Sequence, residues 1–447
     1  MMDNTIAAIS TPLGTGAISI IRMSGKDSIS IINKIFTKDL SNEKSHTIHY
    51  GKIIDNNEEI DEVLVSLMRS PKTFTKEDVI EINCHGGLST TNKVLELLLN
   101  NGAVLASPGE FTKRAFLNGR IDLIEAQGIM DLIEAKTELA RTQAMKELNG
   151  NLSNKIDLLR EKLIEIISNI EVNIDYPEYE DINKVTNEQI YPKIKELIQE
   201  IDNLIASSED GKIIKEGITI GIIGKPNVGK SSLLNAILEE EKAIVTDIEG
   251  TTRDTIEGTT IINGIACNFI DTAGIRNSNN IVEQIGVNKS KKIIDTCDLV
   301  LLVLNNNDII TKEEQELLEQ IRNKPHIVIV NKIDLEQKLK LNEECIKISI
   351  KEKKGLEQIK DKISEIFNLE KIKTQDMTYL SNARSISLLT KANNLLVSSL
   401  TNIENNYPID IVEIDLKESW NTLGEIIGKT YTDELLDEMF QRFCLGK

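Results

Sequence analysis

The sequence has 447 residues, 40% of them hydrophobic and 28% charged, a composition typical of globular proteins. Because compact domains average about 150 residues, this length predicts about three domains. The chain has 52 basic and 71 acidic residues, and its net charge of −19 gives no support for a nucleic-acid partner. The acidic total does not exclude such a partner, because a local basic patch can coexist with it. No apolar run reaches the roughly 18 residues of a membrane span and no signal peptide is visible, so we expect a cytoplasmic protein with no membrane partner.

The five cysteines lie far apart, with no C-x-x-C pair, which argues against a zinc site and against a disulfide framework. Cys444 is the fourth residue from the end, where a prenylation signal would begin. The tetrapeptide Cys-Leu-Gly-Lys lacks the aliphatic pair and the usual last residue, so we expect no lipidation.

The first 120 residues mix short β-type runs with two helical patterns. Asn56 and Asn57, between two of these runs, predict a hairpin turn. The expected strands are residues 17–23, 46–54, 62–68 and 79–84, and the expected helices are residues 26–36 and 89–100. This mixture predicts a compact α+β domain.

From Ile121 the pattern becomes helical, with Leu and Ile at helical spacing through residue 173. A further helix is expected over residues 189–206, and the sequence Ser-Ser-Glu-Asp-Gly at 207–211 predicts a linker. Helical patterns return at residues 383–403, 416–428 and 432–443. The segment between the two helical regions therefore reads as a module inserted into an α-helical domain.

Residues 224–231, Gly-Lys-Pro-Asn-Val-Gly-Lys-Ser, match the phosphate-binding pattern G-x-x-x-x-G-K-[ST]. An apolar strand over residues 218–223 precedes the motif and a helix over residues 232–238 follows it, which is the context that the motif requires. The glycines allow backbone N–H groups to turn toward the phosphates at a positive helix N-terminus. Lys230 is expected to reach the β- and γ-phosphates, and the Ser231 hydroxyl is expected to bind Mg²⁺.

Two polar segments downstream are expected to sense the γ-phosphate. Residues 246–254 form a loop suited to a switch segment, in which Thr252 would complete the Mg²⁺ shell. Asp271, at the end of an expected strand over residues 266–270, would hold Mg²⁺ through water. The N–H group of Gly274 would then meet the γ-phosphate.

The segment Asn331-Lys332-Ile333-Asp334 follows an expected strand over residues 326–330 and indicates recognition of guanine. A carboxylate at Asp334 can accept from both the ring N1–H and the exocyclic amine, and adenine would leave it unpaired. Ser349 is a weaker candidate for a loop that contacts the base. The complete set of expected nucleotide contacts is Asn227, Val228, Gly229, Lys230, Ser231, Ser232, Thr246, Asp247, Ile248, Glu249, Gly250, Thr251, Thr252, Asp271, Thr272, Ala273, Gly274, Asn331, Lys332, Asp334 and Ser349.

Three positions determine how such a site would hydrolyse GTP. Ile275 occupies the position where Ras-like enzymes carry the water-orienting glutamine, and an aliphatic side chain cannot polarise water. Glu283 is the best available carboxylate for that role, and capping of the following helix is its alternative role. Asn227 can hold a monovalent cation beside the phosphates, although asparagine also suits the turn geometry.

The whole chain resembles the MnmE (TrmE) family of tRNA modification GTPases. The resemblance rests on residues 22–25, 108–119 and 250–254, on Glu81-x-x-x-His85-Gly86-Gly87, and on the terminal Cys-Leu-Gly-Lys. It implies a multidomain protein: an N-terminal α+β domain (residues 1–120) that binds tetrahydrofolate and dimerises, a helical domain (121–215 plus 371–447), and an inserted α/β Ras-like P-loop GTPase domain (216–370).

The resemblance also implies a reaction. A homodimer would work in a heterotetramer with the flavin-containing (FAD-dependent) partner MnmG (GidA). Together they would install an aminomethyl or carboxymethylaminomethyl group at C5 of the wobble uridine of certain tRNAs. A 5,10-methylene- or 5-formyl-tetrahydrofolate would supply or mimic the one-carbon unit, with glycine or ammonium as the amine.

Further site residues follow from the resemblance alone. Folate contacts would be Arg22, Glu81, Arg120 and Lys447, where position 120 carries Arg and relatives can carry Lys. Potassium would be held by Asn227, Thr246, Thr251 and the backbone of Ile248, and would promote pairing of two GTPase domains. Glu283 matches the family's water-orienting acid, and Cys444 is a candidate nucleophile whose role stays open.

Two other functions fit parts of the sequence. A ribosome-assembly GTPase would share the nucleotide motifs but would usually add an RNA-binding module or a second GTPase domain. A one-carbon-transfer enzyme with a merely regulatory GTPase would turn over independently of GTP. The N-terminal segment and the terminal tetrapeptide favour the tRNA modification enzyme over both.

Overall fold

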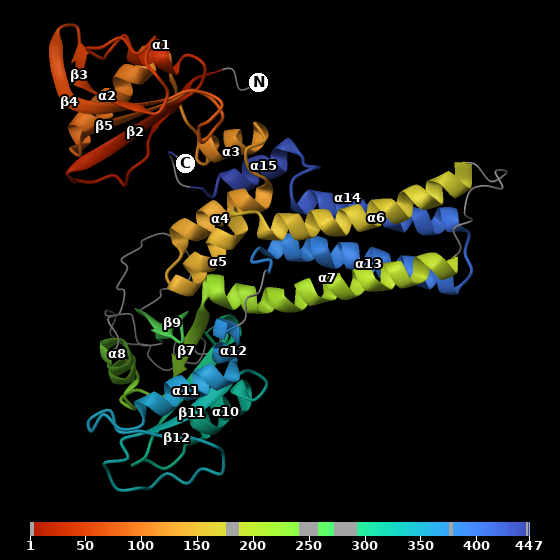
Figure 1. Cartoon of the computed structure of the whole chain (residues 1–447). Coiled ribbons are helices and arrows are strands. Elements are labelled where there is room, and N and C mark those ends of the chain that lie inside the picture. The colour runs from red at the N-terminus through yellow and green to blue at the C-terminus, as the bar shows by residue number, and fades with distance from the viewer. Residues whose placement is uncertain are drawn as a thin grey trace. The chain divides into compact units, whose positions relative to one another are not determined.

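The computed structural model describes residues 4–175, 187–240, 258–271, 293–374, 379–443 and 446. The chain forms two compact units, each built from discontinuous segments (Figure 1). Unit 1 comprises residues 1–130, 147–198 and 388–447, and unit 2 comprises residues 131–146 and 199–387. Among the described residues, no helix combines the length and the apolar character that a bilayer crossing needs.

Unit 1 begins with a six-stranded sheet in the order β3-β4-β5-β2-β1-β6. Its strands are β1 (Ile6–Ile9), β2 (Ile18–Ser24), β3 (Thr47–Asp55), β4 (Glu58–Met68), β5 (Val79–His85) and β6 (Val104–Leu105). Neighbours are antiparallel except β1 and β6, which are parallel. The four expected strands are confirmed to within a few residues, whereas β1 and β6 are too short to give a periodic signal.

The turn between β3 and β4 confirms the predicted hairpin. Asn56 and Asn57 have φ angles of 47° and 78°, the left-handed pair that a tight two-residue turn requires. Helix α1 (Ser28–Ile32) is shorter than the expected helix over residues 26–36, because Phe36 instead forms a β-bridge with Ile53.

One face of this sheet is covered by α1 and α2 (Leu88–Asn100). Helix α2 buries Val94, Leu97 and Leu98 against the alternating apolar residues of β2, β4 and β5. The alternation of buried and exposed residues along the strands is the pattern of a sheet with one covered face.

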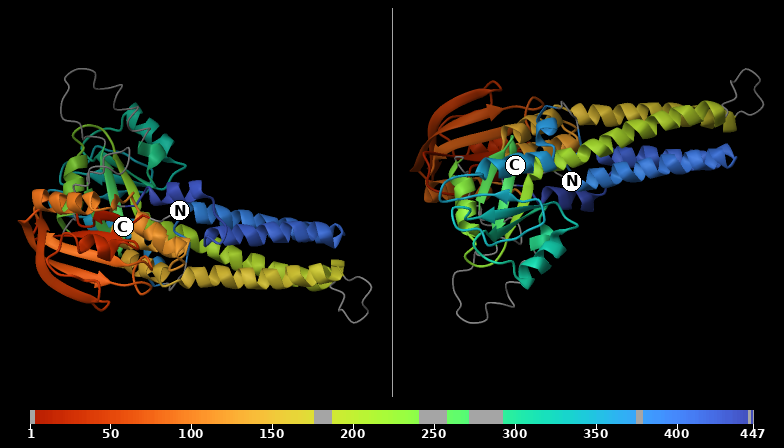
Figure 2. Two further views of the ribbon diagram at one scale, coloured as in Figure 1. Left: turned by 90° about the horizontal axis from the view of Figure 1, so that it is seen from above. Right: turned by 90° about the horizontal axis from the view of Figure 1, so that it is seen from below.

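The helical part of unit 1 is an elongated bundle (Figure 2). It contains α3 (Glu110–Leu117), α6 (Asn151–Asp175), α14 (Ile409–Ile426) and α15 (Asp433–Phe440), most of α4 (Leu123–Glu134), and the parts of α7 (Asn187–Glu216) and α13 (Ala383–Glu404) that fall in unit 1. Helix α5 (Glu138–Leu148) lies mostly in unit 2. Helices α6 and α14 pack along one another, and the buried Arg160 guanidinium stacks 4.2 Å from the centroid of the Trp420 ring. Helix α14 begins seven residues earlier than expected, directly after Pro408, whose fixed φ of −55° suits a helix start.

Unit 2 contains a six-stranded sheet in the order β12-β11-β10-β7-β9-β8. Its elements are β7 (Ile218–Ile223), α8 (Lys230–Glu240), β8 (Gly258–Ile262), β9 (Ile265–Asp271), β10 (Leu299–Asn305), α10 (Lys312–Ile321), β11 (His326–Asn331), β12 (Ile346–Lys347), α11 (Leu356–Ile366) and α12 (Leu369–Thr374). All neighbours are parallel except β8 and β9.

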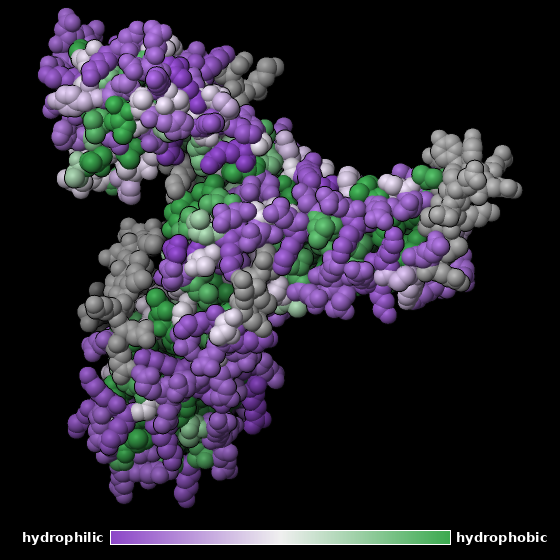
Figure 3. Space-filling model, in the orientation of Figure 1, coloured by the Kyte–Doolittle hydropathy of each residue, from purple (hydrophilic) through white to green (hydrophobic). Residues whose placement is uncertain are grey.

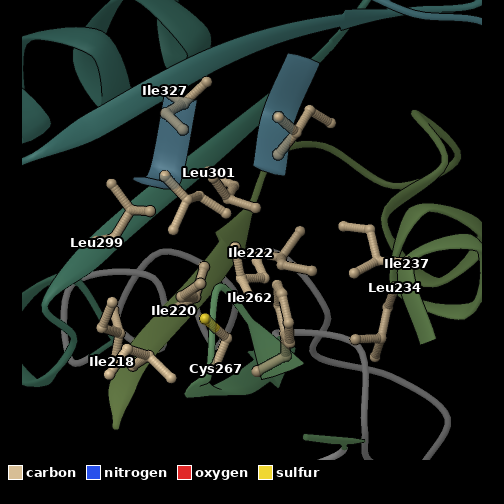
Figure 4. Close-up of a cluster of buried hydrophobic side chains, with 14 of the residues drawn as sticks. Ile218, Ile220, Ile222, Leu234, Ile237, Ile262, Cys267, Leu299, Leu301 and Ile327 are labelled. Atoms are coloured by element: carbon tan, nitrogen blue, oxygen red, sulfur yellow. The ribbon is translucent and has the colours of Figure 1, made fainter. Parts of the chain in front are cut away.

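Both faces of this sheet are buried. Alternate residues of β10 contribute to two apolar clusters, Leu299 and Leu301 to one and Val300 and Leu302 to the other. Figure 4 shows the first cluster, in which the side chains of β7, β10 and α8 meet. A parallel sheet covered on both faces explains why its strands read as unbroken apolar runs. Polar and charged residues dominate the outer surface over α10 and α11 on the side seen in Figure 3.

The linker expected at residues 207–211 is wrong, because α7 continues through this segment to Glu216. The hydroxyl groups of Ser207 and Ser208 donate back to the carbonyl of Leu204 at 2.9 and 2.8 Å, so both serines fit inside the helix. Gly211 allows the buried Tyr379 ring to lie against the helix, since a Cβ atom there would come within 2.0 Å of the ring.

Replacing Gly211 with alanine should therefore destabilise unit 2 despite alanine's higher helix propensity. The clash with Tyr379 should lower the free energy of unfolding by about 2 kcal/mol, the usual cost of overpacking. Chemical denaturation of the full chain measures this change. Ser207→Ala on the same helix is the matched control and should change stability by no more than about 0.5 kcal/mol. Equal stability of Gly211→Ala and the parent would contradict this packing.

Candidate functional site

Three polar segments of unit 2 lie at one edge of its sheet. Residues 224–229 follow β7, Asn331 ends β11 and leads into residues 332–334, and Ser349 follows β12. These strands are parallel, so their carboxyl ends lie along the same edge. Ligands of open α/β sheets bind at that edge, beside the strand from which the chain extends the sheet in both directions. Here that strand is β7, with β9 on one side and β10 on the other. The topology thus brings together segments up to 125 residues apart in the sequence.

The loop between β7 and α8 depends on two glycines. Gly224 has a φ of 142° and Gly229 a φ of 106°, both in the region that side-chain-bearing residues avoid. A Cβ atom at Gly224 would lie 2.4 Å from the carbonyl oxygen of Val303, and one at Gly229 would lie 2.4 Å from Nδ2 of Asn331. The loop therefore packs so closely on β10 and β11 that only glycine fits at either position.

Asn331 and Lys332 hold this loop from the neighbouring strand. The amide Nδ2 of Asn331 donates to the carbonyl of Val228 at 2.9 Å, and Lys332 Nζ donates to the carbonyl of Asn227 at 2.8 Å. Asn331 and Val228 are both buried, so this hydrogen bond is shielded from water. Asn227 and Lys332 each have a φ of 64°, which turns the chain sharply at both contact points.

Lys230 is the first residue of α8, and its ammonium group lies across the loop. It donates to the carbonyl oxygens of Gly224 and Lys225 at 2.9 and 2.8 Å. Ser231 and Ser232 follow in the first turn of α8 and are exposed. A cation placed at a helix N-terminus is the arrangement that binds phosphate groups in many proteins.

Asp334 and Ser349, the two residues predicted to contact the base, lie within hydrogen-bond distance of one another. Ser349 donates its hydroxyl to Oδ1 of Asp334 at 2.7 Å, and this bond is the main cause that lowers the pKa of Asp334. The carboxylate is therefore ionised at neutral pH and acts only as an acceptor. An acceptor-only group can pair with a base that offers two adjacent donors but not with a base that lacks them.

One supporting interaction was not predicted from the sequence. Glu314, buried in the first turn of α10, lies 3.8 Å from Lys225 Nζ in the phosphate loop and also accepts from the backbone N–H of Thr311 at 2.9 Å. Thr311 and Glu314 form a capping box, and their T-x-x-E spacing is the sequence signal that could have identified them.

Several expected site residues lie outside the described residues. These are Thr246, Asp247, Ile248, Glu249, Gly250, Thr251, Thr252, Thr272, Ala273, Gly274, Ile275, Glu283, Cys444 and Lys447. The backbone of Asp271 is described, and it ends β9 opposite Ile222 of β7. That register places the backbone of Asp271 beside the strand that leads into the phosphate loop.

A second group of expected residues lies in unit 1, on adjacent strands. Arg22 of β2 and Glu81 of β5 are direct cross-strand partners, and Arg22 Nε donates to Oε1 of Glu81 at 2.8 Å. The side chains are 22% and 24% exposed, so the pair is accessible from solvent. Arg22 Nη1 also donates at 3.3 Å to the carbonyl oxygen of Gly446, next to the C-terminal residue.

Arg22 and Arg120 each lie over a phenylalanine ring. The Arg22 guanidinium lies 5.7 Å from the centroid of the Phe111 ring, and that of Arg120 lies 4.8 Å from the centroid of Phe74. Phe74 packs against the small apolar cluster that contains Phe111. Two cations therefore border one aromatic cluster, beside a carboxylate that can accept hydrogen bonds.

The sequence matches known proteins over its whole length. Residues 5–120 match the family described as "GTP-binding protein TrmE N-terminus", and residues 123–444 match "MnmE helical domain". The chain is 50% identical over 458 residues to the tRNA modification GTPase MnmE of Bacillus cytotoxicus, with 100% of both chains covered. It is 51% identical over 449 residues to the MnmE of Streptococcus thermophilus, covering 99% of this chain and 98% of the relative.

Solved structures match part of the chain. The G domain of the T. maritima FeoB iron transporter is 27% identical, with a TM-score of 0.25, and the match covers 33% of this chain and 97% of that domain. Aquifex aeolicus Era bound to GDP and AlF4⁻ is 25% identical, with a TM-score of 0.25, and covers 40% of this chain and 66% of that one.

The arrangement of Asp334 predicts a change of base preference. In Asp334→Asn the carboxylate, which only accepts, is replaced by an amide that both donates and accepts. The affinity for GTP should therefore fall on the order of 100-fold, and the affinity for xanthosine triphosphate should rise. Titration of the two nucleotides by calorimetry measures both effects. Asp308→Asn, at an exposed position in another loop after β10, is the control and should bind GTP as the parent does. Undiminished GTP affinity in Asp334→Asn would refute the assignment of this carboxylate.

Proposed function

The chain belongs to the MnmE family of tRNA modification GTPases, and from this premise we propose that it is a GTP hydrolase acting in the modification of tRNA. The observation that carries the proposal for this chain is the joining of the phosphate loop to the base-recognition segment by Asn331 and Lys332. Those contacts fix the distance between the phosphate and base ends of a nucleotide. A pre-formed separation of this kind favours guanosine triphosphate over smaller phosphate ligands.

In this proposal Lys230 and the α8 amides bind the β- and γ-phosphates, and Asp334 and Ser349 bind the guanine. Ser231, Thr252 and Asp271 would hold Mg²⁺, which neutralises charge on the phosphates when it is bound. The first-turn position of Ser231 and the register of Asp271 beside β7 support this set. Glu283 would orient the attacking water, since Ile275 cannot.

Potassium is proposed as the activating cation. Asn227, in the exposed part of the phosphate loop, would contribute to its site together with Thr246, Thr251 and the backbone of Ile248. The Asn227 backbone is turned by its positive φ and held by Lys332, so its side chain projects from a fixed point of the loop. Such a cation would supply positive charge that other GTPases obtain from an arginine finger, and would favour pairing of two GTPase domains.

The group formed by Arg22, Glu81 and Arg120 is the proposed site for a reduced folate such as 5,10-methylene-tetrahydrofolate, with Lys447 as a further contact. A guanidinium can pair with the glutamate carboxylates of folate, and a carboxylate can accept from the pterin ring. The aromatic cluster beneath the two arginines offers an apolar surface for the rest of the ligand. The Gly446 contact with Arg22 supports the assignment of the chain end to this site.

The proposed reaction modifies C5 of the wobble uridine in certain tRNAs. The protein would act as a homodimer together with the flavin-containing partner MnmG. The folate would deliver one carbon and glycine or ammonium the amine, giving a carboxymethylaminomethyl or aminomethyl group. GTP hydrolysis at the site in unit 2 would be required for product formation.

A reconstituted reaction tests this function. Purified protein, the partner, undermodified tRNA, GTP, methylene-tetrahydrofolate and glycine should give the modified nucleoside, detected by mass spectrometry. Glu283→Ala should bind GTP normally yet hydrolyse it at least about 100-fold more slowly, because the water is no longer oriented. Glu313→Ala, an exposed carboxylate near the phosphate loop, is the control. Normal hydrolysis by Glu283→Ala would reject that residue, and no modified nucleoside with parent protein would reject the function.

The folate site predicts a separate effect of Arg22. Arg22→Gln loses a charged hydrogen-bond donor, so the affinity for 5-formyl-tetrahydrofolate should fall by about 10- to 100-fold. GTP affinity should be unchanged, because the nucleotide residues belong to a different unit. Calorimetry with each ligand measures both affinities. Arg442→Gln, which breaks an exposed pair between Arg442, two residues after α15, and Glu438 of α15, is the matched control. Equal folate affinity of Arg22→Gln and the parent would remove this site from the proposal.

A further inference from the structure

A buried asparagine joins three elements of unit 2. Asn268 lies on β9, opposite Thr259 of β8, and accepts a hydrogen bond from the Thr259 hydroxyl at 2.9 Å. Its amide Nδ2 donates at 3.1 Å to the carbonyl of Glu216, the last residue of α7. Asn268 is 5% exposed and Thr259 8%, so both bonds are shielded from water and expensive to break.

The end of α7 is also held against β9 by its backbone. Gly217, with a φ of 77°, follows α7 directly, and a Cβ atom there would lie 2.3 Å from the carbonyl of Ala266. The helix end and β9 therefore touch with no space for a side chain. A displacement of β9 relative to α7 would have to break the Asn268 bond or shift the helix end with it.

Lys215, one residue before Glu216, continues this chain of contacts. Its ammonium lies 2.8 Å from Oδ1 of Asp131 in α4, and the carboxylate's other oxygen accepts at 3.1 Å from the hydroxyl of Ser381. The Asp131 side chain is 7% exposed and Ser381 is 8% exposed. One buried carboxylate thus binds both the segment that leads into the inserted module and the segment that leaves it.

The contacts link two functionally different parts of unit 2, as the positions of these residues along the chain indicate. Residues 246–254, a proposed γ-phosphate-sensing segment, precede β8, and Asp271, which begins the other, ends β9. At the opposite end, α4, α7 and α13 each continue from unit 2 into unit 1 at residues 130, 198 and 387. The contacts from Asn268 to Asp131 therefore connect the strand pair between the two sensing segments with the helices that leave the unit.

We propose that Thr259, Asn268, the end of α7, Asp131 and Ser381 form a relay that couples the nucleotide state of unit 2 to α4 and α7. These residues are positioning residues, since none is placed against the nucleotide. The inference rests on the proposed function, because it needs a site that alternates between GTP and GDP. A nucleotide can shift these helices only if the relay has different energies in the two states, and removing one contact should reduce that difference.

Two substitutions test the central ion pair. Asp131→Asn preserves the shape of the side chain and an acceptor for Ser381 but removes the charge that Lys215 pairs with. Lys215→Gln removes the partner charge, and Lys215→Arg restores a cation of similar reach. Lys212→Gln, one turn earlier on α7, breaks only a weak exposed pair at 4.0 Å and is the matched control.

The measurement is amide hydrogen exchange by mass spectrometry on the full chain, saturated either with GDP or with a non-hydrolysable GTP analogue. In the parent, peptides from α4 and α7 should exchange at different rates in the two states. Asp131→Asn and Lys215→Gln should reduce this difference at least about threefold, with analogue affinity within about twofold of the parent. Lys215→Arg and Lys212→Gln should retain the difference.

A nucleotide-dependent difference that persists in Asp131→Asn and Lys215→Gln would overturn the relay, as would an equal loss in Lys212→Gln. A parent protein that binds and hydrolyses GTP but shows no difference in α4 and α7 would also overturn it, while leaving the proposed function intact. Failure to bind GTP at all would instead defeat the proposed function. Should Asp131→Asn fail to fold, the comparison of Lys215→Gln with Lys215→Arg carries the test.

Discussion

The contact between Asn331 and the phosphate loop is the constraint on which the nucleotide site depends. Its amide meets the Val228 carbonyl at 2.9 Å, directly beside Gly229, where no side chain could be accommodated. One buried hydrogen bond thereby joins the end of β11 to the loop after β7, although β10 lies between them in the sheet. Because the loop cannot move away from the strand without exposing this bond's buried groups, the bond holds the proposed phosphate-binding loop firmly against the segment proposed to bind the base.

This rigidity is useful only if another part of the module can respond to the nucleotide. The described residues of the phosphate loop and of the Asn331 segment are fixed by close packing, whereas β8 and β9 lie at the opposite side of the sheet from β11 and β12. They follow and precede the segments proposed to sense the γ-phosphate. In the proposed arrangement β7 and β11 hold the nucleotide in place, while β8 and β9 are the strands free to respond to it. Asn268 lies on β9, where it joins these two strands to α7.

The sequence predicted the strands and turns around the proposed nucleotide site well, because their signals are local. The strand over residues 218–223 was predicted to the residue, and the loop and base-recognition motifs carry fixed spacings that follow from backbone geometry. Arg22 and Glu81 were predicted as site residues only through the family resemblance, since two charges 59 positions apart give no local signal. Register alone makes them neighbours, and register is a property of the assembled sheet.

The errors have a common physical origin. The expected linker at residues 207–211 contains residue types that favour turns in isolation, but packing against Tyr379 stabilises the helix there and overrides that preference. Helix α1 ends early for the same kind of reason, since Phe36 gains a bridge to β3. The relay through Asn268 and Asp131 was not predicted. Its members come from two strands, two helices and the segment before α13, and each polar residue alone gives no distinctive signal.

In the proposed GTP site, a monovalent cation at Asn227 supplies catalytic charge. The most direct test is the steady-state rate of GTP hydrolysis by the full chain in potassium and in sodium buffer at matched ionic strength. We expect a potassium-specific acceleration on the order of tenfold or more, since the cation replaces the charge of an arginine finger. Equal rates in the two buffers would contradict it and would remove the cation from the mechanism.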